Sequence, residues 1–308
     1  MWWWSSSSKG RSNLERFLLG VTPKPPSFSL PQGKEEIKYF MLGDLWNYYD
    51  ELSAYGFGSQ VDLSNGETVM QYYVPYLSAI QIHTNKPALM SRSLSEVVES
   101  ESSECWSDSE SEKLLSRSMS NDSSKTWDAV SEDSVFDPDG TILLRDRLGY
   151  LDFKYIERDP PYKRVPLTDK INELAEKYPG LMTLRSVDMS PASWMAVPDI
   201  SHPKLREREG LDDMLLTYHT LSSSFQDNVV EGDSSNNKVM EETECCVVNK
   251  RIPLPPFGLA AYKMQGDLWG KTGFDQDRLI YLQSAADSWL KQLNVDHHDY
   301  NFFINSNF

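Results

Sequence analysis

The sequence predicts an α+β fold, in which helices pack on an antiparallel sheet of roughly five or six strands and two long disordered inserts interrupt the domain. Three observations predict this class. Apolar residues recur at helical spacing in 44–55, 169–178 and 275–293. Short segments rich in β-branched and aromatic residues lie between these helices. Two further segments are strongly polar, but the chain as a whole is 39% hydrophobic, which is enough to form a core.

A flexible N-terminal arm is predicted for residues 1–36. Its run TPKPPSFSLPQG contains four prolines, which forbid regular structure, and a short amphipathic piece, SNLERFLLG, precedes them. The first part of the domain, 37–90, begins with the helix 44–55. The following ETVMQYYVPYLSAIQIHT is typical of a strand or hairpin arm, and Pro75 within it favours an edge strand or a bulge.

The two inserts are predicted at 91–140, which is acidic and rich in serine, and at 222–250. Between Glu96 and Asp139 the chain has 13 acidic and three basic residues, which account for most of the net charge of −16. Such a segment buries too little apolar surface to offset its chain entropy, so we expect disorder in both inserts.

The second part of the domain, 141–221, contains the helix 169–178, with Thr168 or Asp169 as its expected N-cap. TILLRDRLGYLDFKYI is expected to be a helix or strand that enters a second strand. LMTLRSVDMSPASWMAV and DDMLLTYHTLSS are expected to be strands.

The C-terminal part, 251–308, begins with a proline-led strand, PLPPFGLAAYKMQGDLW. The helix 275–293 follows, with Asp275 as its expected N-cap. GDLW therefore occurs twice, first opening a helix and then closing a strand. Because the flanking residues of the two copies share nothing, we interpret the repetition as coincidence.

Composition excludes several classes of function. The acidic chain lacks the basic stripe of a nucleic-acid binder, so nucleic acid is not expected as a partner. No apolar run approaches the ~18 residues of a membrane span, so no membrane association is expected. Cys105, Cys245 and Cys246 form neither a disulfide framework nor a zinc spacing. These observations favour a cytoplasmic or nuclear location.

Several blocks in order resemble one family. They include YFMLGDLWNYYDELSAYGFG, QYYVPYLSAIQIHT, LTYHTLSSSF, FGLAAYKMQG and LQSAADSWLKQLNVDHHDYNFF. Together they resemble the plant family catalogued as domain of unknown function 789, from about Asn13 to near the C-terminus. The resemblance implies no catalytic residue, cofactor or substrate.

One segment departs from the family pattern. After SWMAV, family members resemble each other in a strand of the type Ala-Trp-Tyr-Pro-Ile-Tyr-His-Ile-Pro, whereas this chain has PDISHPKLREREG. Codons for a family-like Trp-Tyr-Pro-Ile-Ser-His-Ile-Pro-Lys, read out of frame, can encode Val-Pro-Asp-Ile-Ser-His-Pro-Lys. We hypothesise that 197–211 is frameshifted or alternatively spliced, which would replace a core strand by a charged loop. Ordinary divergence is the alternative.

Five residues are candidates for a pocket: Trp46, Asp50, Tyr55, Arg158 and Tyr162. Carboxylates beside aromatic rings occur in glycosidase-type sites, and an arginine can bind a carboxylate or phosphate. The structural alternative for the carboxylates is that Asp50 and Glu51 point to different sides of a helix, while Asp44 stabilises its N-terminus. For ERDPPY the alternative is a turn that ends a strand, with Arg and Asp bridging locally.

The acidic insert contains candidate phosphorylation sites. Ser93, Ser107, Ser109 and Ser134 each have an acidic residue three positions later, the pattern that acidophilic kinases accept. Each phosphate would add about −1.5 to −2 charges. The functional interpretation is a docking loop that binds basic partners and is regulated by phosphorylation. The alternative is a solubilising linker.

The histidines are too scattered in sequence for a metal site, and we interpret His297 and His298, with Asp296 and Asp299, as a solvated turn after the last helix. No cofactor is expected, since the common nucleotide and catalytic motifs are absent. The sequence therefore favours a non-catalytic regulatory or scaffold protein that acts through unknown protein partners. The alternative is an enzyme or small-ligand binder with a pocket near Asp50, Tyr55 and Arg158.

Overall fold

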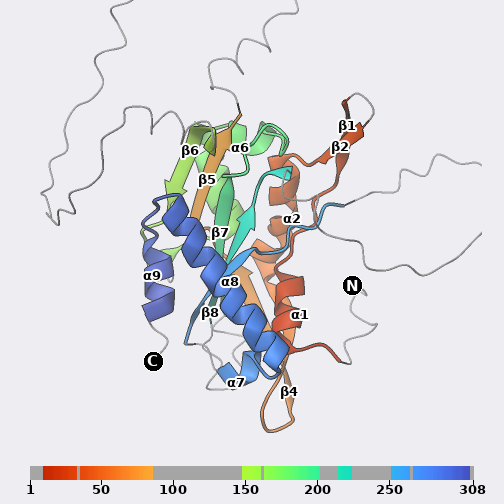
Figure 1. The fold of residues 1–308 in the computed structure, drawn as a ribbon, viewed down its shortest axis with the longest axis vertical. Coiled ribbons are helices and arrows are strands. Elements are labelled where there is room, and N and C mark those ends of the chain that lie inside the picture. The colour runs from red at the N-terminus through yellow and green to blue at the C-terminus, as the bar shows by residue number, and fades with distance from the viewer. Residues whose placement is uncertain are drawn as a thin grey trace, which may run out of the picture. The chain divides into compact units, whose positions relative to one another are not determined.

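A computed structural model describes residues 10–32, 35–85, 148–160, 163–201, 214–223, 251–263 and 266–305. These residues belong to one compact unit, and they confirm the α+β class, because helices pack on an antiparallel sheet (Figure 1). The insert 91–140 and nearly all of 222–250 lie outside the described residues.

Seven strands of the described residues form the main sheet, and every pairing in it is antiparallel. They are β3 (Phe57–Asp62), β4 (Thr68–Pro75), β5 (Ala79–Thr84), β6 (Tyr150–Ile156), β7 (Trp194–Ser201), β8 (Met214–Thr220) and β9 (Gly258–Tyr262). One edge of β7 pairs with β8, which pairs in turn with β9. The other edge of β7 pairs with both β4 and β5.

β4 and β5 follow the same edge of β7 as one bent strand. Pro75 lies opposite Asp199, whereas Ala79 lies opposite Ala196, so the β4–β5 strand contains one extra residue. This is the geometry of a β-bulge, one of the two arrangements expected from Pro75. The expectation of an edge strand is wrong, because β3 and β6 pair with the outer edge.

Helices cover both faces of this sheet. Alternate strand residues point to opposite faces. Ile80 and Met195 pack with α2 (Leu42–Tyr55), α5 (Leu167–Lys177) and α6 (Gly180–Thr183). On the other face, Trp194 and Tyr218 pack with α8 (Gly273–Gln292) and α9 (His298–Asn305). In Figure 1, α8 crosses the strands diagonally.

Part of the expected N-terminal arm belongs to the folded core, which corrects the prediction for 1–36. α1 (Asn13–Gly20) is capped by the Ser12 side chain, and its Leu14 and Phe17 are fully buried. The Phe17 ring lies edge-on to Trp269. Further along, β1 (Phe28–Gln32) and β2 (Glu35–Tyr39) form a hairpin. The apolar spacing in SNLERFLLG therefore indicated a buried helix, although prolines follow it closely.

Two predicted helix caps are wrong in position. α8 begins at Gly273 with Thr272 as its N-cap, while Asp275 completes a capping box from the third helical position. α5 begins at Leu167, and its Thr168 hydroxyl pairs with the Ser53 hydroxyl at 2.8 Å instead of capping the helix.

Two expected strands are partly helical. The segment 180–193 contains α6 and a loop, and its strand begins only at Trp194. The second GDLW is a short helix, α7 (Gly266–Trp269), rather than the end of a strand. Its Trp269 is fully buried, whereas Trp46 of the first copy lies in another core cluster. The two copies thus occupy unrelated positions.

The hypothesised frameshift segment continues the sheet as far as the structure describes it. Residues 197–201 complete β7, where a charged loop was expected, and 202–211 lie outside the described residues. Asp199 is 2% exposed, and its Oδ2 has no hydrogen-bond partner among the described residues. Loss of hydration raises the pKa of Asp199 well above its usual range.

Candidate functional site

The structure does not gather the predicted pocket residues. Trp46 is buried, and its Nε1 donates to the Leu181 carbonyl at 2.6 Å. Asp50 and Arg158 are exposed, and Tyr55 is 79% exposed. Tyr162 lies outside the described residues. None of the four described residues lines either of the two cavities described below.

The turn after β6 is fixed by Glu157 rather than by a bridge between Arg158 and Asp159. The Glu157 carboxylate accepts the backbone N–H groups of both following residues, at 2.8 and 2.9 Å, and the Tyr155 hydroxyl at 2.6 Å. Burial alone would raise the pKa of Glu157, but these hydrogen bonds lower it below its usual value.

A buried polar network joins the bulge of the sheet to α9. Ser78, in the bulge, donates to Asp299 Oδ2 at 2.5 Å and contacts His297 Nε2 at 2.8 Å. Arg164 holds both Asp299 oxygens, at 2.6 and 2.8 Å. The Tyr218 hydroxyl lies 2.9 Å from His297 Nδ1. The solvated turn expected at His297 and Asp299 is therefore wrong, because each residue is 2% exposed.

A serine, a histidine and an aspartate in contact raise the question of nucleophilic catalysis. The Ser78 proton is directed to Asp299, so His297 Nε2 must carry the ring proton and donate it to Ser78. Burial lowers the pKa of His297 to about 4, which keeps the ring neutral. A serine nucleophile needs the opposite arrangement, in which the imidazole accepts its proton. Ser78 is also fully buried, so the network serves to connect structural elements.

A small cavity of about 330 Å³ borders this network, beside Lys291, Asn294 and Tyr300. His297 lines it as well, but both ring nitrogens are already paired with Ser78 and Tyr218. The cavity therefore offers no basic imidazole nitrogen to a ligand.

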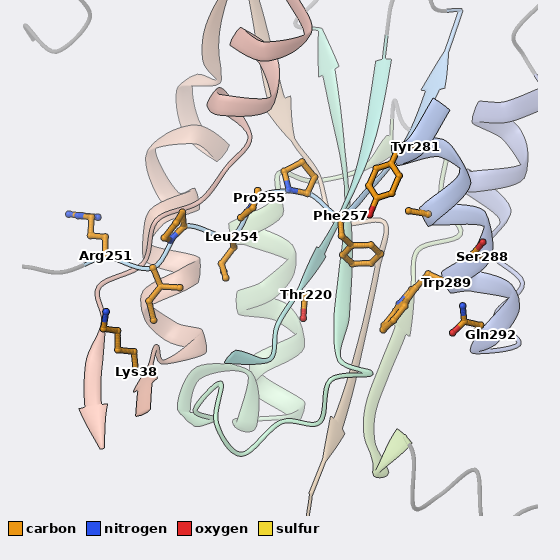
Figure 2. Close-up of a pocket in the computed structure, with 14 residues that line it drawn as sticks. Lys38, Thr220, Arg251, Leu254, Pro255, Phe257, Tyr281, Ser288, Trp289 and Gln292 are labelled. Carbon is orange, nitrogen blue, oxygen red and sulfur yellow. The ribbon is translucent and has the colours of Figure 1, made fainter. Parts of the chain in front are cut away.

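A larger groove, of about 850 Å³, lies between α8 and the extended segment 251–257, and we name it the α8 groove. Figure 2 shows its lining side chains. The segment is extended because Pro253, Pro255 and Pro256 fix their own backbone angles and lack N–H donors. The remaining N–H groups of Ile252 and Leu254 donate to the backbone of residues 23–25, at 3.0 and 2.9 Å.

Buried and exposed side chains alternate along segment 251–257, which forms one wall of the groove. Ile252 and Leu254 are anchored in the core, whereas Pro253 and Pro255 are exposed. At the end of the segment, Phe257 donates its backbone N–H to β8 at 2.9 Å. Pro253 and Pro255 thus present a rigid apolar surface outward, whereas Pro256 is buried.

One stripe of α8 builds the opposite wall. Tyr281, Ala285, Ser288 and Gln292 follow each other at helical spacing, so they face the groove together. Trp289 lies beside this stripe. Its ring centroid is 5.3 Å from that of Phe257, and the two rings are arranged edge to face. The aromatic end of the groove therefore has Tyr281, which is 69% exposed, next to two packed rings.

The sequence interpretation missed the groove, because its walls are distant along the chain. A signal existed in α8. Tyr281 and Phe274 are large apolar residues outside the predicted apolar face, and the structure leaves both mostly exposed. Apolar residues on the outer side of an amphipathic helix indicate a contact surface.

The predicted phosphorylation sites lie outside the described residues, whereas metal binding and membrane spans can be assessed within them. Ser93, Ser107, Ser109 and Ser134 are outside the described residues. Within the described ranges, no group of three or more His, Cys, Asp or Glu residues is arranged to hold a metal ion. No helix there combines the length and the apolar character needed to cross a membrane.

Comparison with known proteins gives one match. The model of a family described as "Protein of unknown function (DUF789)" covers residues 12–303. No curated protein and no solved structure matches the chain.

Proposed function

The chain belongs to the DUF789 family, whose function is unknown, and we propose that it is a regulatory or scaffold protein that binds an extended segment of a partner in the α8 groove. The observation that carries this proposal is the exposed apolar lining of the groove. Tyr281, Pro253 and Pro255 are held in place by the fold, and no described residue covers them.

The dimensions of the groove suit an extended peptide. Its volume of about 850 Å³ lies in the range of ligand sites. Segment 251–257 is extended, so its ends lie about 20 Å apart at ~3.1–3.4 Å per residue. A partner segment of about six residues can therefore follow this wall.

The chemistry of the lining favours a peptide with proline or aromatic side chains. Aromatic rings that flank a shallow groove bind polyproline-type segments in several peptide-recognition domains. Ala285 and Ser288 are small, so a bound backbone can approach α8 closely between the larger Tyr281 and Gln292.

The groove is tested by selecting random eight-residue peptides, displayed on phage, against the full chain. We expect enriched peptides to bind at least tenfold more weakly to Tyr281→Ala, which removes an exposed ring without disturbing the core. They should fail to bind Ser288→Trp, in which an indole fills the groove. Circular dichroism melting checks that both variants fold. Enriched peptides that bind Ser288→Trp as tightly as wild type, or a selection without enrichment, contradict the proposal.

The acidic segment 91–140 supplies the regulatory part of this proposal. Phosphorylation of Ser93, Ser107, Ser109 and Ser134 by an acidophilic kinase would strengthen its attraction to a basic region of the partner, separate from the segment that enters the α8 groove, in the cytosol or nucleus. Treatment with an acidophilic kinase should phosphorylate these serines, and the fourfold Ser→Ala variant should remain unmodified in intact-mass measurements. Equal modification of both chains contradicts the assignment.

A further inference from the structure

The two ends of the α8 groove differ in charge. Lys38 of β2 and Arg251 line one end, while the aromatic side chains Tyr281 and Trp289 line the other (Figure 2). Both cations are exposed, and neither forms a salt bridge within the described part of the chain. This end is positive although the chain as a whole has a net charge of −16.

Arg251 contributes to folding through its backbone and one guanidinium nitrogen. Its Nη1 donates to the Lys24 carbonyl at 2.9 Å, and its backbone forms a β-bridge with Pro26. A guanidinium has five N–H donors, so several remain for another acceptor. Because the guanidinium is planar, it suits the two oxygens of a carboxylate.

We propose that the partner segment of the α8 groove is an acidic peptide, with carboxylates at the Lys38–Arg251 end and a proline or aromatic side chain at the Tyr281–Trp289 end. The inference rests on the proposed function and adds the chemical class of the partner. Charge complementarity carries it, since opposite charges across an interface fix the register and exclude wrong partners. The ~20 Å between the ends places the two features about five or six residues apart in an extended chain.

Nucleic acid fits these observations less well than a peptide. Two cations on an acidic protein cannot follow a phosphate backbone, which carries one charge per nucleotide. The exposed prolines and the small Ala285 and Ser288 suit a narrow polypeptide chain better than stacked bases.

The test uses synthetic fluorescein-labelled peptides and the full chain. In the acidic pair, a Pro-Trp-Pro block is joined by three glycines to Asp-Asp-Glu, in both orders. In the neutral pair, Asn-Asn-Gln replaces the acids. We expect one acidic peptide to bind wild type about tenfold more tightly than its neutral counterpart, measured by fluorescence anisotropy at low salt. This preference should diminish at 0.5 M salt, because salt screens exposed charges.

The variants separate charge from shape. Lys38→Glu combined with Arg251→Glu should abolish the preference for the acidic peptide while the neutral peptide still binds. Lys154→Glu, at an exposed cation on β6, is the matched control and should retain most of the preference. Equal binding of acidic and neutral peptides overturns this inference and leaves the proposed function standing. Absence of binding by every peptide, or undiminished binding to Ser288→Trp, overturns both.

Discussion

Arg164 and Asp299 form a bidentate ion pair, and their side chains are 1% and 3% exposed, respectively. The pair joins the loop before α5 to the start of α9, on the opposite side of the sheet. Burial alone would raise the pKa of Asp299, but hydrogen bonds from Arg164 and Ser78 lower it below its usual value.

Removal of one partner should therefore be costly. Asp299→Ala leaves the Arg164 guanidinium buried without a counter-charge, and we expect a loss of about 3–5 kcal/mol in the free energy of unfolding. Urea denaturation measures the loss. The double variant Arg164→Met with Asp299→Leu should recover much of it, because no buried charge remains. A loss below about 1 kcal/mol for Asp299→Ala would show that the pair is not structural.

Asp199 should make stability fall as the pH rises. Its folded-state pKa is raised, so above the unfolded pKa of ~3.9 the folded chain binds the proton more tightly than the unfolded chain. This contribution is fully present below pH ~3.9 and is lost as the pH rises through the folded pKa. Asp199→Asn cannot ionise. Its stability relative to wild type should therefore increase between pH 5 and pH 8 in urea denaturation, and a constant difference would contradict the raised pKa of this buried carboxyl group.

His219 should make the stability of the fold decrease as the pH falls. Its Nδ1 donates to the Leu254 carbonyl at 2.8 Å, and burial lowers its pKa to about 4. Stability from the neutral ring is present above the unfolded pKa of ~6.5 and is lost as the pH falls towards 4. His219→Asn retains a donor and should lose less stability than wild type between pH 6.5 and 4.5. A loss between pH 6.5 and 4.5 as large as that of wild type would contradict this role of His219.

Gly258 should determine how closely α8 approaches the sheet. A Cβ there would lie 2.9 Å from the Ala286 Cβ and 3.0 Å from its Cα. Gly258→Ala should therefore displace α8, cost about 1–3 kcal/mol, and weaken peptide binding in the α8 groove. Gly273→Ala is the control, because a Cβ at that position meets no atom within 4 Å. Equal melting temperatures and peptide affinities for the two variants would contradict this role.

Local patterns predicted the three longest helices well, missed the short helices, and predicted the polar contacts poorly. Leu279, Leu282 and Ala286 form a buried face of α8, as their spacing indicated. His297 and Asp299 were expected in solvent, since short-range polarity cannot show that Arg164 and Ser78 lie beside them. The α8 groove was missed for the same reason, because its walls meet only after the sheet has formed.

Asp199 is the described residue that bears most directly on the frameshift hypothesis. A core strand rarely contains a buried carboxylate oxygen without a hydrogen-bond partner, and Asp199 Oδ2 has none among the described residues. Residues 197–201 nevertheless have a strand conformation, so β7 accommodates Asp199 with its backbone pairing intact. Sequencing the transcript through these codons decides between a shifted frame and ordinary divergence.

The bent β4–β5 strand also sets an order of events during protein synthesis. Its outer edge can pair early with β3, but its inner edge needs β7, which begins at Trp194. At ~5–20 residues per second, the ribosome needs roughly 5 to 20 s to deliver residues 85–193. Throughout that interval the nascent chain presents an unpaired strand edge containing Val74 and Ile80, which exposes it to chaperones and to neighbouring chains on the same polysome.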